Sequence, residues 1–398
     1  MTRPVVFVSL ALLVMVGFVA ASSSRLADDS QRSAKILAAT EQHDPLPTST
    51  TTPPPRSVTM AFTGDLLPHG PVQARAAQLA SGSVGGPADS ESHDFTPMFE
   101  LVAPVLREAD LAICHLETPL SIDGTDLSGY PTFNAPAALA QAAAEAGYDG
   151  CSTASNHSWD RGRQGVLDTL TVLDDVGLAA AGTAATADDD RPARYRRNGL
   201  AIAHLSYTYG MNGFEVPVDQ PWLVDLIDVD QIEADVRAAR AGDADVVVVS
   251  LHWGIEYQAE PTAEQQAIAE RLLAHPDIDL LVGHHAHVVQ PADRQRGKVV
   301  LYGLGNFLSN QSSACCPAAS QDGVIALVTL TEDGERFRTR VEYVPTWVDR
   351  SSFTIVPTSG DLAAGSGVEP GVLEQSRSRT EAALGMLGAR GVRELAES

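Results

Sequence analysis

The chain has 398 residues, 44% of them hydrophobic, which is enough to bury a large core. Its formal net charge is -24, and lysine occurs only at positions 35 and 298. So acidic a chain repels the backbone of a nucleic acid, and it has no basic cluster for anionic lipid. The composition therefore excludes nucleic acid as an expected partner and predicts a strongly acidic, solvated surface.

The first 24 residues are typical of a targeting segment. Arg3 precedes an apolar stretch at residues 4–20, and small residues follow it. We expect a signal peptide or an N-terminal membrane anchor at 1–24, and no other segment that crosses a bilayer. The protein would then work outside the cytoplasmic membrane, either secreted or anchored by its N-terminus. Residues 25–57 are rich in Ser, Thr and Pro, which predicts an extended linker.

Strand-like and helical patterns alternate from residue 58 onward. Helices are expected at 96–108, 136–146, 164–176, 229–241 and 262–274. Strands are expected at 58–63, 111–114, 148–153, 202–205, 246–250, 278–282 and 299–302, and two alternating runs at 323–330 and 336–344 predict paired antiparallel strands. Repeated strand–helix units predict an α/β domain at 58–350 with a second sheet packed on the first. Residues 351–398 would form a C-terminal tail, helical near 372–387.

The four cysteines do not form a zinc-binding pattern. Cys114 and Cys151 lie in apolar strand-like runs, where they fit either buried thiols or a disulfide. Cys315 and Cys316 lie in a polar loop. Because the chain contains no Cys-x-x-Cys, we do not expect a thiolate zinc site.

Five expected strands end in side chains of the kinds that bind metals. The residues are Asp65, Glu117, Asn156, His252, His285 and His287. Sites in α/β sheets form outside the carboxyl ends of the strands, so these side chains are expected to meet there. The mixture of carboxylate, amide and imidazole suits borderline divalent metals, and the number of ligands suffices for two ions. Taken singly, the same residues also fit turn caps, loop acids, a core histidine and a solvated His-rich turn.

These segments resemble those of the poly-γ-glutamate capsule biosynthesis (CapA-like) proteins, within the calcineurin-like metallophosphoesterase superfamily. The resemblance runs from about residue 58 to 347, and its six motifs occur in the family's order. They are Gly64-Asp65, Leu116-Glu117-Thr118-Pro119-Leu120, Asn156-His157 with Asp160 and Gly162, His252-Trp253-Gly254 with Glu256, Gly283-His284-His285 with His287, and Tyr302-Gly303-Leu304-Gly305-Asn306-Phe307. The resemblance implies a metallophosphatase-like four-layer α/β/β/α sandwich with two packed β-sheets.

The resemblance also implies a role for each of these residues. Asp65, Glu117, Asn156, His252, His285 and His287 would hold divalent metal ions, two by analogy, with Mn, Zn or Fe as candidates. His157 would donate a proton to the leaving oxygen, and Asp160 would orient it. His284, Glu256 and Asn306 would support the ligands from behind.

The chain departs from the family pattern at four positions. The family usually has Asn at His115 and Ser155 and Pro at Ala286, and the superfamily usually has His at Leu67. His69 stands four residues after Asp65, whereas the superfamily's histidine stands two residues after the aspartate. A site with one metal ion therefore stays open beside the site with two.

Three functions fit these observations. The first is an extracytoplasmic metal-dependent hydrolase of the phosphoesterase type, acting in poly-γ-glutamate capsule or cell-envelope polymer synthesis. The second is a non-catalytic, membrane-tethered accessory in polymer assembly or export. The third is a nucleotidase or general phosphodiesterase. The expected partners are the polymer synthesis machinery and either an anionic polymer, for which Arg161 and Arg163 offer part of a positive groove, or a phosphoester.

Overall fold

The computed structural model describes residues 54–82, 92–388 and 392–395. The chain divides into a unit at Met1–Pro54 and a compact unit at Pro55–Ser398, and apart from Pro54 the described residues all belong to the second. The expected targeting segment and nearly all of the linker therefore lie outside the described residues. Within the described part of the chain, none of the helices has the length and apolar character needed to span a membrane.

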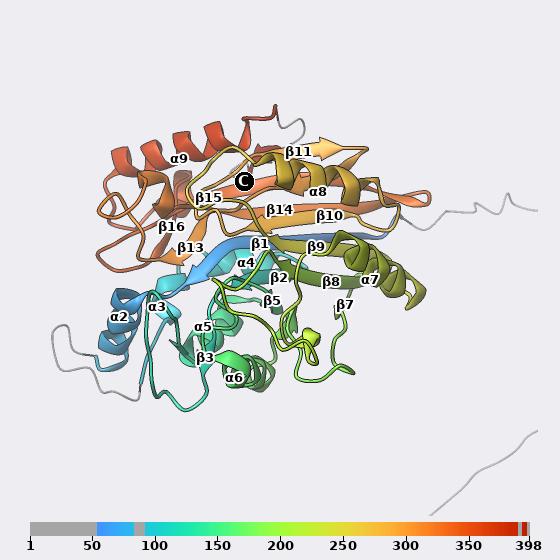
Figure 1. The fold of residues 1–398 in the computed structure, drawn as a ribbon. Helices are drawn as coiled ribbons and strands as arrows, with labels where there is room; N and C mark the ends of the chain where they lie inside the picture. The colour runs from blue at the N-terminus through green and yellow to red at the C-terminus, as the bar shows by residue number, and fades with distance from the viewer. Residues whose placement is uncertain (1–53, 83–91, 389–391, 396–398) are drawn as a thin grey trace, which may run out of the picture. The chain divides into compact units, whose positions relative to one another are not determined.

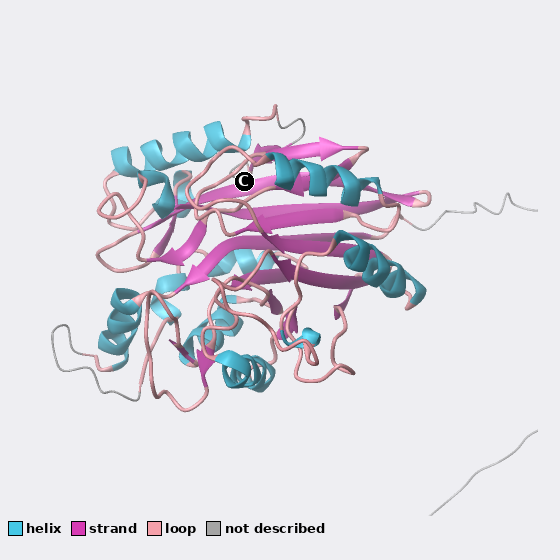
Figure 2. Ribbon diagram, in the orientation of Figure 1, coloured by secondary structure: helices cyan, strands magenta, loops and turns pink. Residues whose placement is uncertain are grey.

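Two β-sheets form the centre of the described unit (Figures 1 and 2). The strands of the larger sheet, in spatial order, are β16 (Ile355–Pro357), β15 (Arg336–Val348), β14 (Asp322–Asp333), β1 (Ser57–Leu67), β2 (Leu111–Leu116), β5 (Gly150–Ser152) and β6 (Ala179–Ala181). Two short strands join it, β13 (Asn306–Ser309) beside β1 and β17 (Val392–Glu394) beside β15.

The smaller sheet has six strands. Their order is β11 (Ala292–Gln295), β12 (Lys298–Leu301), β10 (Leu280–His284), β9 (Val246–His252), β8 (Leu200–Thr208) and β7 (Ala193–Arg197). Strands β8, β9, β10 and β12 are parallel, so their carboxyl ends share one edge of the sheet. A separate pair, β3 (Leu120–Ser121) and β4 (Ala135–Pro136), lies outside both sheets.

Helices cover the outer face of each sheet. The larger sheet carries α2 (Gly70–Ala80), α3 (Thr96–Phe99), α4 (Ala103–Glu108) and α5 (Ala138–Ala146), with α6 (Gly162–Asp175) beside β3 and β6. The smaller sheet carries α7 (Val229–Ala241) and α8 (Ala263–Ala274). The last helix, α9 (Pro370–Leu384), contacts β14 and β15 (Figure 1).

Alternation along the strands explains why the layers pack in this way. Val246 and Val248 of β9 lie in the cluster between the sheets, whereas Val247 and Val249 lie in the cluster beneath α7 and α8. A strand that is covered on both faces needs such an uninterrupted apolar run. Met60 of β1 joins the cluster between the sheets from the other side. The expected four-layer α/β/β/α sandwich with two packed sheets is therefore confirmed.

Several short strands and the helix α2 were not expected, and one expected helix differs from the structure. The single helix expected at 96–108 is wrong, because α3 ends at Phe99 and α4 starts at Ala103. Pro104, near the start of α4, cannot donate to a carbonyl one turn earlier, and its ring disfavours helical backbone just before it. The interruption therefore follows from a proline inside an otherwise helical pattern.

The C-terminal segment packs against the larger sheet. The expected tail helix is α9, and Asp322 of β14 accepts hydrogen bonds from Ser376 Oγ at 2.6 Å and Arg379 Nε at 2.7 Å. Strands β16 and β17 pair with β15. Residues 355–357, 370–384 and 392–394 thus belong to the same compact unit as the domain expected at 58–350.

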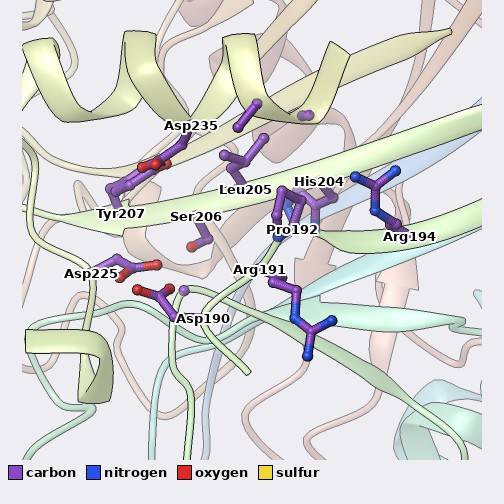
Figure 3. Close-up of a pocket in the computed structure, with 13 residues that line it drawn as sticks. Asp190, Arg191, Pro192, Arg194, His204, Leu205, Ser206, Tyr207, Asp225 and Asp235 are labelled. Atoms are coloured by element: carbon purple, nitrogen blue, oxygen red, sulfur yellow. Dashed lines mark hydrogen bonds between the residues drawn. The ribbon is translucent and has the colours of Figure 1, made fainter. Parts of the chain in front are cut away.

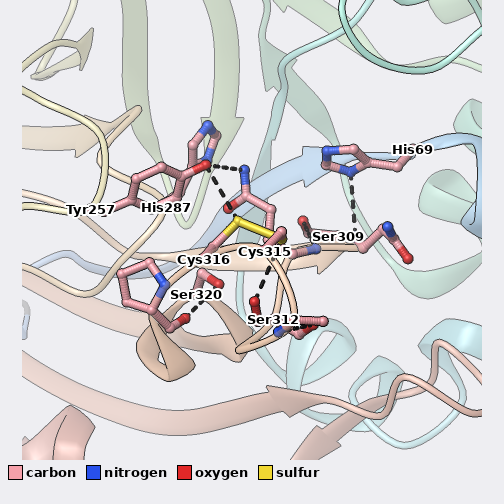
Figure 4. Close-up of a disulfide and its surroundings, with 12 residues drawn as sticks. His69, Tyr257, His287, Ser309, Ser312, Cys315, Cys316 and Ser320 are labelled. Carbon is pink, nitrogen blue, oxygen red and sulfur yellow. Dashed lines mark hydrogen bonds between the residues drawn. A yellow bond between two sulfur atoms is a disulfide. The ribbon is translucent and has the colours of Figure 1, made fainter.

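The cysteines are paired in the structure. Cys114 and Cys151, which are register partners on β2 and β5, are bonded to each other, so the disulfide alternative applies to them. Cys315 and Cys316, neighbours in the chain, are also bonded to each other (Figure 4). Neither pair takes part in a metal-ligand cluster.

Candidate metal centre

The carboxyl ends of strands from both sheets converge on one site. The larger sheet supplies Asp65 from β1 and Glu117 directly after β2, while β9 of the smaller sheet supplies His252. His284 ends β10 and is the register partner of His252. The sequence-predicted ligands therefore come from two different sheets that meet at this edge.

Gly64 allows Asp65 to take its place. A Cβ atom at position 64 would lie 2.3 Å from the carbonyl oxygen of Gly305, so no larger residue fits without moving the backbone. The same carbonyl accepts a hydrogen bond from the Asp65 N–H at 2.9 Å. The register between β1 and β2 shifts between Phe62 and Asp65, which turns the carboxylate toward the histidines.

Asp65 is surrounded by the His-rich turn after β10. His284 Nδ1 lies 3.1 Å from Oδ1, His287 Nδ1 lies 3.2 Å from Oδ2, and the His285 N–H donates to Oδ2 at 3.3 Å. Burial alone would raise the pKa of Asp65, but the hydrogen bonds from His284 and His287 outweigh it and hold that pKa well below its usual range. Asp65 is therefore a carboxylate ready to bind a cation.

The turn itself has unusual backbone geometry. His285 and His287 have φ values of 91° and 53°. Non-glycine residues seldom adopt positive φ, and such residues cluster at functional sites. This conformation brings both imidazoles to the same centre as Asp65.

Glu117 lies at the middle of the site. It is 1% exposed, and its Oε1 is 3.6 Å from His287 Nε2 and 3.9 Å from His252 Nε2. Asn156 Oδ1 lies 2.8 Å from His252 Nε2. The ligand atoms of Glu117, His252 and His285 all lie within 4.8 Å of one another, as do those of Asp65, Glu117 and His287.

The buried groups fit divalent metal ions. Neither Glu117 oxygen forms a hydrogen bond with any described residue, and His285 Nδ1 also lacks a partner. A buried carboxylate without a partner costs several kcal/mol unless a proton or a cation neutralises it. Accordingly, burial raises the pKa of Glu117 well above its usual value in the metal-free protein. A cation between Glu117 and the surrounding histidines would remove this cost.

Two of the imidazoles, those of His252 and His285, are in the form that metals require, whereas the Glu117 and Asp65 carboxylates outweigh burial and raise the pKa of His287 to about 9. Burial lowers the pKa of His252 well below its usual value and the pKa of His285 to about 3. Both rings are therefore neutral near pH 7 and have a nitrogen lone pair to offer.

His157 and Asp160 form a hydrogen-bonded pair. His157 Nδ1 donates to Asp160 Oδ2 at 2.7 Å, and the Phe133 N–H donates to the same oxygen at 2.6 Å. The Phe133 ring packs edge-on against the His157 ring, with centroids 4.7 Å apart. The ring of His157 is thus fixed from two sides.

Three residues have contacts that the sequence alone did not assign. His115, in place of the family's usual Asn, bonds through Nε2 to His252 Nδ1 at 2.9 Å, and its ring stacks on His284 with centroids 4.0 Å apart. Glu256, expected as a supporting residue, has an oxygen within 4.8 Å of ligand atoms of His285 and His287. Asn306, also expected as a supporting residue, has Oδ1 3.1 Å from His287 Nδ1.

Sequence analysis missed Tyr209 and Asn212. The Tyr209 ring lies 4.7 Å from the His285 ring between centroids, and Asn212 Oδ1 accepts a hydrogen bond from Asn156 Nδ2 at 3.2 Å. Both residues follow β8, and Thr208 at its end is the register partner of His252. The signal was the same as for the other residues, namely polar side chains after a strand, but their side chains are not typical metal ligands.

Two cavities are of interest. One, of about 470 Å³, opens beside the candidate metal centre and is lined by His157, His287 and Glu256 among others. The other, of about 210 Å³, is lined by residues such as Asp190, Asp225 and His204 (Figure 3). The second cavity contains none of the predicted site residues. Arg161 and Arg163, considered for a positive groove, line neither cavity.

Comparison with known proteins identifies the family. Residues 59–311 match the family described as bacterial capsule synthesis protein PGA_cap. Similar proteins include the capsule biosynthesis protein CapA of Bacillus anthracis, 29% identical over 225 residues, or 54% of each chain. The PGA biosynthesis protein CapA of Bacillus subtilis (strain 168) is 28% identical over 221 residues, which cover 54% of this chain and 57% of that protein. The matched part thus spans little more than half the length of these relatives.

A solved structure of similar arrangement is the calcineurin-like phosphoesterase YfkN from Bacillus subtilis. It is 12% identical, the match covers 82% of this chain and 97% of that one, and the TM-score is 0.43. A likeness of this size carries no argument about function. The match of residues 59–311, by contrast, covers more than half of the chain. The protein belongs to the bacterial capsule synthesis protein PGA_cap family.

Proposed function

We propose that this protein is a metal-dependent phosphoester hydrolase that acts outside the cytoplasmic membrane in the synthesis of poly-γ-glutamate capsule or another envelope polymer. The observation that carries the proposal is the buried Glu117 carboxylate, which has no hydrogen-bond partner among the described residues and lies amid Asp65 and several histidines. Family membership supports the link to capsule synthesis.

The residues that would hold the metal are those that converge at the strand ends. Asp65, Glu117, Asn156, His252, His285 and His287 are the proposed ligands, with His284 and Glu256 close enough to join them. When bound, divalent ions at such a site make water acidic and stabilise negative charge on phosphoryl oxygens. Because His252 and His285 are neutral, they can bind without losing a proton, whereas a bound cation would displace the protons held by Glu117 and His287.

The chain's own residues would carry the proton. Because Asp160 holds Nδ1 of His157, the proton for the leaving oxygen is held at Nε2. His157 lines the 470 Å³ cavity, so the leaving group would lie there. In the overall reaction the oxygen of water bonds to phosphorus and the phosphorus–oxygen bond to the leaving group breaks. The leaving oxygen takes the proton from His157, and the proton that the water gives up replaces it on His157.

Location and partners belong to the same proposal. The charged start, apolar centre and small residues of 1–24 support export or anchoring, and the linker after them would let the folded unit reach polymer machinery at the membrane. Fractionation of cells that express the full chain, compared with a chain lacking residues 1–24, tests this. Recovery of both from the cytoplasm would contradict it.

The experiment for the hydrolase is a phosphoester screen with the purified chain after incubation with Mn or Zn. His157→Gln should lower turnover and keep the metal, whereas Asp65→Asn should lower both. A matched control is His275→Gln, a histidine at the end of α8 that belongs to none of the candidate metal-ligand clusters among the described residues. Bound metal without turnover of any phosphoester would favour the non-catalytic accessory role.

A further inference from the structure

The cavity beside the candidate metal centre has a distinct chemical character. Its wall contains the rings of Tyr130, Phe133 and Tyr257, together with Leu67 and the bonded sulfurs of Cys315 and Cys316. Among the described residues that line it there is no lysine or arginine, although 27 such residues occur in the chain. The cavity is therefore apolar and aromatic on one side, and its described lining offers no lysine or arginine to an anionic ligand.

The rings are held in place by specific contacts. Phe133 packs edge-on against both His157 and His69, with centroid distances of 4.7 and 5.3 Å. The Tyr257 hydroxyl accepts a hydrogen bond from Gln311 Nε2 at 3.1 Å and lies 3.7 Å from Cys316 Sγ (Figure 4). Tyr130, by contrast, is 79% exposed at the rim.

Among the described residues, the cavity wall carries one carboxylate, and His287 on the same wall is paired with Asp65. Glu256 lines it, and its carboxylate lies within 4.8 Å of ligand atoms of His285 and His287. Arg161, the nearest arginine in the chain to His157, donates to the carbonyl of Asp126 at 3.1 Å and bonds Ser128, and so supports the loop that carries Tyr130 instead of facing the cavity. A carboxylate that entered the cavity would meet Glu256, and the imidazole of His287 on the same wall is already paired with Asp65.

From these contacts we infer that the leaving group bound in this cavity is uncharged and carries a planar ring, so that a polyglutamate chain is not what the cavity holds. The inference rests on the proposed function for the position of the leaving group, because His157 is the proton donor on the cavity wall. The faces and edges of aromatic side chains pack favourably against planar rings, and the exposed ring of Tyr130 offers a further surface for this packing. The substrate class is a phosphoester of an uncharged, ring-bearing alcohol or phenol.

Equilibrium binding of three phosphonates to the purified, metal-loaded full chain tests the inference. Phenylphosphonate carries the ring, 4-carboxyphenylphosphonate adds one negative charge to it, and methylphosphonate lacks the ring. We expect phenylphosphonate to bind about tenfold more tightly than either of the others. Equal or tighter binding of the carboxylated ring, equal binding of the methyl compound, or no binding of any of the three would overturn the inference.

Variants of Tyr130 give the sharpest control, because so exposed a side chain is not needed for folding. Tyr130→Ala should weaken phenylphosphonate binding several-fold and leave methylphosphonate binding unchanged. Tyr130→Arg should favour the carboxylated ring relative to the native chain. Phe214→Ala, which removes another exposed ring outside the cavity wall, should change none of the three affinities. Equal effects of Tyr130→Ala and Phe214→Ala would contradict the assignment.

Hydrolysis separates this inference from the proposed function. If phenyl phosphate is not hydrolysed but phosphonates bind with the expected preference, the hydrolase proposal fails and the inference on the cavity's ligand holds. If phenyl phosphate and 4-carboxyphenyl phosphate are hydrolysed with equal kcat/KM, the hydrolase proposal holds and the inference fails.

Discussion

Replacing Asp160 by Asn tests how His157 is prepared for proton transfer. Asp160 has a side chain that is 1% exposed and accepts from His157 Nδ1 at 2.7 Å. Hydrogen bonds that involve charged groups contribute about 1.5–3 kcal/mol, and each 1.36 kcal/mol on a barrier changes the rate about tenfold. Losing the charge of this one partner should therefore lower kcat by about 10- to 150-fold.

The size of this loss should depend on the leaving group. Phenoxide is a stronger base than 4-nitrophenoxide and needs the proton more, so Asp160→Asn should impair phenyl phosphate strongly and 4-nitrophenyl phosphate little. Steady-state kcat values for both esters, with bound metal measured in parallel, provide the assay. Equal losses for the two esters, or loss of metal from the variant, would refute the role given to Asp160 and His157.

Three further predictions concern stability. Glu117→Gln should change the free energy of unfolding of the metal-free protein at pH 7 by less than about 1 kcal/mol, because burial raises the pKa of that carboxyl. In thermal unfolding the same change should abolish the stabilisation by bound metal, which is about 2.7 kcal/mol when the metal concentration is 100 times Kd. Burial lowers the pKa of His204 to about 3, so the folded state binds fewer protons than the unfolded state. The free energy of unfolding should therefore fall by up to roughly 5 kcal/mol as the pH falls from about 6.5 toward 3. Urea unfolding should show a shallower fall in His204→Gln. Gly283→Ala places a Cβ 1.9 Å from the Tyr302 carbonyl oxygen and should cost about 1–3 kcal/mol or more, whereas Gly70→Ala, with nothing within 4 Å, should be tolerated. A smaller loss of unfolding free energy at position 283 than at position 70 would contradict the close approach of Gly283 to the Tyr302 carbonyl.

The layers of the fold were predictable because the strands that build them are apolar on both faces. The run at 246–250 has no polar residue before Ser250, and the structure buries it between a sheet and two helices. The short strand β13 was not predicted, because it pairs with β1, far away along the chain. Strand β7 forms a hairpin with β8 across Asn198 and Gly199, a turn signal that sequence analysis overlooked. The interruption between α3 and α4 could have been predicted from Pro104.

The site was predictable as a set of residues but not as a geometry. Strand-end positions identified Asp65, Glu117 and His252, and the structure brings all three together. The sequence could not show that the ligands come from two sheets, nor that His115 would bond to His252, since both depend on how β2 and β9 face one another. Tyr209 was missed because an aromatic residue that packs on a metal ligand follows no recognisable spacing in the sequence.

The most direct test of the metal centre is the metal content of the purified protein after incubation with Mn or Zn. The native chain should bind about two equivalents, and His252→Ala and His285→Ala should each bind less. His275→Ala, outside the predicted ligand clusters, should bind as much as the native chain. A folded native chain without bound metal would contradict the account. Equal metal content in the native chain and all three variants would also contradict it.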